Sequence, residues 1–72
     1  MAQSVYKVIT LVGSSTESWE KAARAAITQA AHSLRDLRIA NVVEQDIHID
    51  DAGGGLIYRV KLEVSFKYEG GS

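Results

Sequence analysis

The segment Leu56–Glu69, "LIYRVKLEVSFKYE", alternates between apolar and polar residues without interruption. Such alternation is typical of a β-strand with one buried face, because successive side chains of a strand point to opposite sides. At about 14 residues, the predicted strand is more than twice as long as the usual strand of about 5–6 residues. A fold of this chain must therefore supply an unusually long apolar surface to cover one face of that strand.

A second strand and a helix are expected in the first half of the chain. The segment Val5–Val12, "VYKVITLV", is rich in β-branched residues and predicts a strand that ends at Gly13. Ser18 is the expected N-cap of the helix. The helix presents an apolar, mostly alanine stripe at i, i+3/i+4 spacing, formed by Trp19, Ala22, Ala23, Ala26, Ile27, Ala30, Leu34 and Leu37. A stripe of alanines allows the helix to lie very close to a sheet.

A third strand is expected to begin near Ile39 and to include "VVEQDIHID", Val42–Asp50. The glycine-rich "DDAGGG", Asp50–Gly55, predicts the turn into the last strand, because Gly tolerates positive φ and Asp caps its own backbone. The resulting order is β-α-β-β. We predict an α+β fold in which a three-stranded antiparallel sheet is wrapped on one helix.

The length of the chain makes self-association the strongest inference from these elements. The sequence has 72 residues, which predicts one domain, 1–72, with tails at 1–3 and 70–72. Chains this short usually need disulfides, a metal or oligomerisation, and the sequence contains no Cys. One short helix cannot cover seven apolar positions on the last strand. Another copy of the chain is the simplest cover.

The charge balance and the apolar runs exclude several classes of function. A net charge of −1, from 8 basic and 9 acidic residues, leaves no electrostatic footprint for nucleic acid. No apolar run approaches a membrane span, and the N-terminus lacks the pattern of a secretory signal, so we expect a soluble, cytoplasmic protein. No nucleophile–base pair or cofactor fingerprint is present, so we expect no enzyme.

The strand Val42–Asp50 carries the main candidate site, a polar row on one face. This row consists of Glu44, Asp46, His48 and Asp50. Carboxylate oxygens suit Ca²⁺ or Mg²⁺, whereas one strand supplies too few ligands to fill a calcium shell. The alternative is a solvated strand face, paired with Arg59, Lys61 and Lys67 of the neighbouring strand through cross-strand ion pairs.

Several segments together resemble the dodecin family over nearly the whole chain. They are "SVYKVITLVGSS", the "SWEKAARAAITQAAHSLRDLRIANVVEQDIHID" that follows, and "YRVKLEVSFKYE". The resemblance implies a hollow, spherical homododecamer that binds flavins such as riboflavin or FMN between tryptophans, without turnover. The position of the flavin-stacking tryptophan is occupied here by Ile39, and that of a flavin-binding glutamine by Arg59. Ile offers no π face and Arg replaces an amide by a fixed charge, so flavin is disfavoured.

The calcium dodecin subgroup is more similar still, because its segments "VIEQD" and "YR-I/V-KLEVSFK" match "VVEQD" (Val42–Asp46) and "YRVKLEVSFK" (Tyr58–Lys67) of this chain. This resemblance implies a divalent cation held by Glu44 and Asp46, with a weaker match at Glu17. We therefore expect a ligand-binding or storage protein with a remodelled flavin site and Ca²⁺ or Mg²⁺ as its ligand. The alternatives are a flavin-storing dodecin and a structural assembly without a small ligand.

Overall fold

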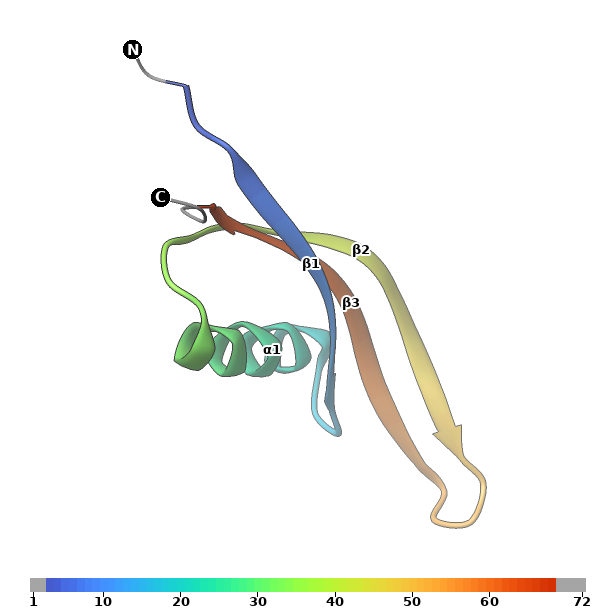
Figure 1. Cartoon of the computed structure of the whole chain (residues 1–72). Helices are drawn as coiled ribbons and strands as arrows, with labels where there is room; N and C mark the ends of the chain where they lie inside the picture. Colours follow the sequence, from blue (N-terminus) through green and yellow to red (C-terminus); the bar gives the residue numbers. More distant parts are fainter. Residues whose placement is uncertain (1–2, 69–72) are drawn as a thin grey trace.

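The described part of the chain forms one helix and three strands in the predicted order β-α-β-β. A computed structural model describes residues 3–68, in which β1 spans Tyr6–Ser15, α1 Trp19–Ser33, β2 Leu37–Asp50 and β3 Gly55–Lys67. The three strands form a long, curved sheet, and α1 packs against one face of it (Figure 1). Apart from Gln3, the tails expected at 1–3 and 70–72 lie outside the described residues, as does Glu69 of the predicted last strand.

The sheet has the order β1-β3-β2, and both pairings are antiparallel. The strand with the longest alternation, β3, is therefore the central one and is paired along both sides. Its position explains why the alternation is complete: one side of β3 faces the helix, and the other carries charged side chains. The predicted antiparallel sheet on one helix is confirmed.

Helix α1 begins where the sequence predicts it and ends earlier. The Ser18 side chain accepts a hydrogen bond from the backbone N–H of Lys21 at 3.0 Å, which caps the helix N-terminus. At the other end, Leu34 has an extended backbone and Asp36 has a φ of 57°. The prediction that the helix, with its apolar stripe, extends to Leu37 is therefore wrong in the last turn. Leu37 is instead the first residue of β2, two residues before the predicted start at Ile39.

The other strand boundaries also differ from the prediction, by one to three residues. Strand β1 continues through Gly13 to Ser15, because Gly13 pairs with Val60 and the ladder does not need a side chain there. Strand β3 begins at Gly55, which was expected to belong to the turn. Between β2 and β3, Gly54 has a φ of 69°, the conformation for which Gly is favoured.

The core is small and lies under the helix. Its buried side chains come from one face of β3 and one face of α1: Val60, Leu62 and Val64 against Ala22, Ala26 and Ala30. Partly buried apolar residues, among them Trp19 and Leu11, surround this cluster. The alanine stripe predicted from sequence thus forms the contact between helix and sheet.

Much of the sheet extends beyond this core. The radius of gyration is 15.0 Å, whereas a compact domain of this length would have about 11 Å. The accessible surface is 5448 Å², against about 4,400 Å² for a compact protein of this mass. Large apolar side chains are exposed on β1 and β2, including Val8, Val12, Ile39 and Ile49. Because β1 and β2 are also the two edges of the sheet, the isolated chain leaves unpaired backbone and apolar surface together, which is typical of a subunit.

The pairing of β2 with β3 shifts twice. One shift lies between Leu37 and Ile39, and the other between Val42 and Glu44, so that Val43 is the extra residue of a bulge. The alternation read through Val42–Asp50 is therefore interrupted at Val43. From Glu44 onward, the alternation follows the sheet as predicted.

Candidate functional site

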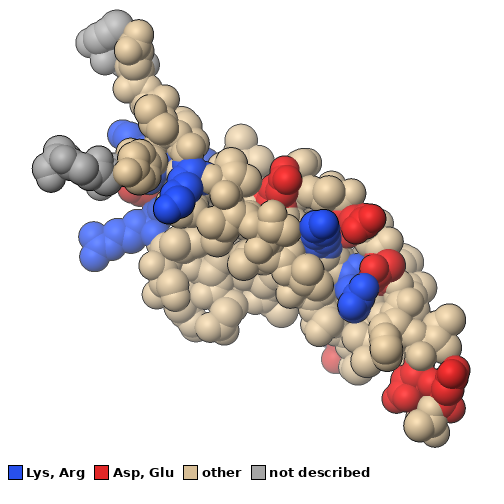
Figure 2. Space-filling model, turned by 45° about the vertical axis from the view of Figure 1, so that its right-hand side comes forward, with Lys and Arg blue, Asp and Glu red and all other residues tan. Residues whose placement is uncertain are grey.

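The polar row of β2 lies on the sheet face that is turned away from α1. Glu44 is paired with Lys61 and Asp46 with Arg59 on β3. Directly opposed residues of an antiparallel pair point to the same side, so acidic and basic side chains share this face. Figure 2 shows basic and acidic side chains next to one another along the molecule, and a further acidic group at its lower right end.

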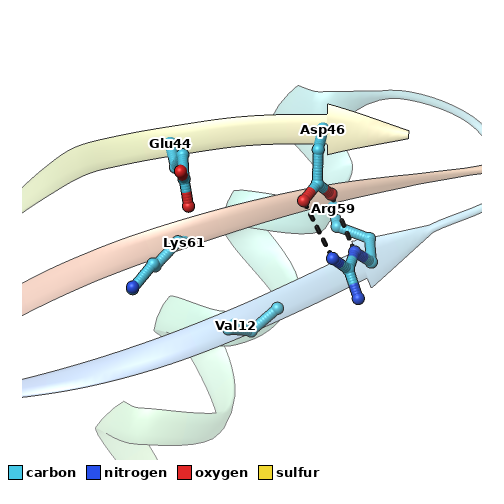
Figure 3. A pocket seen from close by; sticks show the side chains of 5 residues that line it. All are labelled: Val12, Glu44, Asp46, Arg59 and Lys61. Carbon is cyan, nitrogen blue, oxygen red and sulfur yellow. Dashed lines mark hydrogen bonds and ion pairs between the residues drawn. The ribbon is translucent and has the colours of Figure 1, made fainter. Parts of the chain in front are cut away.

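A shallow pocket of about 240 Å³ lies on this face and draws on all three strands. It is lined by Val12, Glu44, Asp46, Arg59 and Lys61. In Figure 3 these side chains lie on the near side of the sheet, while the helix lies behind it. The structure thus brings together two of the predicted site residues, Glu44 and Asp46, with the predicted Arg59.

An ion pair with two hydrogen bonds joins Asp46 and Arg59 across the strands. The Nε of Arg59 donates to Oδ1 of Asp46 at 2.7 Å, and Nη2 donates to Oδ2 at 2.8 Å. These hydrogen bonds hold the pKa of the Asp46 carboxyl below its ordinary value and raise the pKa of Arg59. The solvated-face interpretation, which expected Arg59 to form such a pair, is confirmed at this position. Lys67, by contrast, is paired with Tyr6 on β1 and faces no acid of β2.

The main chain of Asp46 is held from the opposite side of the sheet. The indole Nε1 of Trp19 donates to the backbone oxygen of Asp46 at 3.1 Å. The Trp19 ring also meets Tyr58 edge-on, with ring centroids 5.2 Å apart. Trp19 was predicted to belong to the apolar stripe of the helix, and it does pack against the core. Its contact with Asp46 was missed, because the two residues are 27 positions apart and only the register of β2 brings them together.

Glu44 has a different environment from Asp46. It lies opposite Lys61 and exerts an attractive charge interaction on Arg59, which contributes to the raised pKa of Arg59. Within residues 3–68, no hydrogen bond or ion pair engages the Glu44 carboxylate. Its oxygens are therefore available to a ligand in the pocket.

The remaining predicted site residues lie elsewhere. Glu17, just before α1, forms an ion pair with Lys21 and is not among the residues that line the pocket. Ile39 pairs with Ser65, which is six residues along β3 from Arg59, or about 20 Å at the rise of a strand. A single chain therefore does not bring the two residues of the remodelled flavin site together.

The last two members of the polar row, His48 and Asp50, lie outside the pocket. His48 lies opposite Ile57, and Asp50 accepts a hydrogen bond from the backbone N–H of Gly53 at 3.3 Å in the turn. Asp50 therefore caps the turn, as the residue type predicts. Neither residue lines the pocket.

The oxygen ligands in the pocket are of the type that binds a hard cation, but one chain supplies too few of them. Calcium takes 6–8 oxygen ligands. The described part of the chain contains no group of three or more His, Cys, Asp or Glu side chains placed to hold a metal. Glu44 and Asp46 supply carboxylates, and both Asp46 oxygens accept from Arg59. A calcium site at this pocket therefore needs further ligands from water or another copy.

Comparisons with known proteins agree with this architecture. Residues 5–69 match the model of a family described as Dodecin. A calcium dodecin of Mycobacterium tuberculosis is 55% identical over 64 residues, which is 89% of each protein. A dodecin of Thermus thermophilus is 43% identical over 65 residues, covering 90% of this chain and 93% of the relative.

Solved structures of such proteins have the same fold. The crystal structure of the calcium dodecin from Mycobacterium tuberculosis, described as calcium-chelating and as having a novel calcium-binding site, has a TM-score of 0.85 at 51% identity, with 96% and 97% of the chains covered. A dodecin from Streptomyces coelicolor has a TM-score of 0.88 at 31% identity, with 99% and 100% covered. Among the described residues, no helix has the length and apolar character to cross a membrane.

Proposed function

This chain belongs to the dodecin family, and from that premise we propose that it is a non-enzymatic, Ca²⁺-binding dodecin that works as a homododecamer. The observation that carries the proposal is the pocket in which Glu44 and Asp46 stand side by side on the sheet face away from the helix. The 55% identical relative is named calcium dodecin, which supports Ca²⁺ as the ligand. Carboxylate oxygens are the donors that Ca²⁺ prefers.

The incomplete ligand set supports a site shared with other copies or completed by water. One chain supplies the Glu44 and Asp46 carboxylates, fewer than a calcium ion requires. The exposed apolar surface and open sheet edges of the isolated chain support assembly independently of the ligand. Glu17 is a further proposed ligand. Since it lies outside the pocket of its own chain, it would act in the pocket of a neighbouring copy.

The positions that resemble a flavin site support Ca²⁺ over flavin. Ile39 is 65% exposed and offers an aliphatic surface, which lacks the π face on which a flavin ring stacks. The guanidinium of Arg59 already donates two hydrogen bonds to the carboxylate of Asp46. A guanidinium held in this way does not replace the amide of a glutamine, because it has no acceptor.

Calorimetry on metal-stripped protein tests the proposal, with Ca²⁺, Mg²⁺ and riboflavin titrated separately. We expect Ca²⁺ to bind, and Glu44→Gln to weaken that binding by at least about tenfold, since a carboxylate ligand to a cation is removed. Glu63→Gln is the matched control, because Glu63 lies on the same face of β3, outside the pocket. The control should keep the affinity of the parent.

Two other outcomes correspond to other functions. Micromolar riboflavin binding without a response to Ca²⁺ would establish a flavin-storing dodecin and contradict the proposal. If neither riboflavin nor Ca²⁺ binds and light scattering shows a stable oligomer, the protein is a structural assembly without a small ligand. Light scattering also tests the dodecamer, and a folded monomer would contradict it.

A further inference from the structure

We propose that Arg59 is an internal competitor for the cation, so that Ca²⁺ and the Arg59 guanidinium bind the Asp46 carboxylate in turn. This inference rests on the proposed function and names how the same site is regulated. Its starting point is that both oxygens of Asp46 accept hydrogen bonds from Arg59, at 2.7 and 2.8 Å. A cation that took either oxygen would displace a hydrogen bond of the pair.

The ion pair between Asp46 and Arg59 lies where it can dissociate. The side chains of Arg59 and Asp46 are 48% and 49% exposed, so solvent reaches both partners. Arg59 projects from β3 over the surface of the sheet, and the pocket in front of it is open (Figure 3). Exposed ion pairs of this kind are weak enough for a ligand to compete with them.

The Asp46 carboxylate should stay in place when Arg59 leaves, because a separate contact holds its main chain. The Trp19 indole donates to the Asp46 backbone oxygen and packs edge-on against Tyr58. Neither contact involves the carboxylate. Breaking the ion pair therefore frees ligand oxygens without releasing the strand that carries them.

The charges in the pocket determine what the competition does. Glu44 and Asp46 are balanced by Arg59 and Lys61, so the pocket is close to neutral before a divalent ion enters. The ion must compete with a tethered cation whose local concentration is fixed by the fold. Arg59 thus lowers the affinity and sets the Ca²⁺ concentration at which the site fills.

The experiment measures Ca²⁺ affinity by calorimetry for three variants of the assembled protein. Arg59→Gln removes the competitor, and we expect binding about two- to fivefold tighter than in the parent, in keeping with the modest strength of exposed pairs. Arg59→Lys keeps the charge but cannot make the paired hydrogen bonds, so its affinity should lie between these two. Lys61→Gln removes a neighbouring charge of the same pocket that makes no hydrogen bond to either acid, and its effect should be smaller than that of Arg59→Gln.

Several results would overturn the inference. If Arg59→Gln binds Ca²⁺ as the parent does, or more weakly, Arg59 does not compete. If Lys61→Gln tightens binding as much as Arg59→Gln, the effect is one of net charge alone. In both cases the parent still binds, so the proposed function stands. If neither the parent nor Arg59→Gln binds Ca²⁺, the proposed function fails as well. A crystal structure with Ca²⁺ gives a second readout: Arg59 should be turned away from Asp46, and an intact pair would overturn the inference.

Discussion

Gly13 and Ala22 approach so closely that a Cβ on Gly13 would lie 2.1 Å from the carbonyl oxygen of Ala22. The same Cβ would lie 3.0 Å from the Cβ of Ala26. The backbones of β1 and α1 are therefore in contact, and this contact explains why glycine stands on the strand and alanines stand on the helix. The helix can cover the central strand closely only where no side chain intervenes.

Gly13→Ala should destabilise the fold, by about 1–3 kcal/mol or more, because the added methyl meets backbone that cannot rotate away. Urea unfolding of the parent and the variant measures the difference. Gly55→Ala is the matched control, since nothing lies within 4 Å of a Cβ built there. A neutral Gly13→Ala would show that the helix can move away from the sheet.

Ser18→Ala should cost about 1 kcal/mol, because the Lys21 N–H at the first turn of α1 loses its acceptor. Ser18→Asp keeps an acceptor at the same position and adds a favourable charge at the helix N-terminus, so its stability should stay at least equal to that of the parent. Thermal unfolding followed by circular dichroism compares the two variants. Equal losses in both would show that the serine matters for some reason other than capping.

Trp19→Phe should lower stability by about 0.5–1.5 kcal/mol, because the aromatic packing is largely kept while the hydrogen bond to the Asp46 backbone is lost. Ca²⁺ binding should weaken in parallel, since the strand that carries Asp46 is less firmly held. Tyr58→Phe serves as the control, because it keeps the ring against Trp19. If Ca²⁺ affinity is unchanged in Trp19→Phe, the indole contributes to the fold alone.

The metal-free protein should lose stability in acid in a way that depends on Asp46. Its folded-state pKa is lowered by the hydrogen bonds from Arg59, with a smaller contribution from His48. A lowered pKa means that the stabilisation is complete above the pKa of the unfolded state and is lost as the pH falls through the folded pKa. The stability of the parent should therefore fall more steeply below about pH 4 than that of Asp46→Asn.

Arg59→Gln combined with Ile39→Trp should convert the protein towards flavin binding. The double change supplies the π face and the amide that the family resemblance assigns to the flavin site. Quenching of riboflavin fluorescence measures the gain, and the two single variants are the controls. Arg59→Gln alone should favour Ca²⁺ without binding riboflavin, and failure of the double variant to quench would mean that other positions exclude the flavin.

The elements were predictable where a single local pattern decides them. Complete alternation identified β3 with its apolar face, and Ser18 with the alanine stripe identified the start and the buried side of α1. The end of α1 was not predictable from periodicity, because Leu34 and Leu37 continue the apolar spacing into residues that are extended. Tertiary pairing of Leu37 with Phe66 competes there with helical propensity and prevails.

The site was only partly predictable, because its geometry depends on the register between strands. Sequence alone could place Glu44 and Asp46 on one face of β2, and could name Arg59 as a basic neighbour. It could not say that Arg59 faces Asp46 in particular, or that Lys61 faces Glu44, since a shift of two residues would keep every side chain on its face. The Trp19 contact depends on the same register.

The bulge at Val43 decides which side of the protein the acids occupy. Ala40 and Val42 oppose Val64 and Leu62, on the side of the helix, whereas Glu44 opposes Lys61, on the other. With strict alternation, Glu44 would share the side of Val42. Because Val43 is the extra residue, its deletion would place Glu44 directly after Val42, and ordinary alternation would then leave both side chains on their present faces. The bulge thus absorbs one residue, so that Val42 faces the helix side and Glu44 faces the pocket although only one residue separates them.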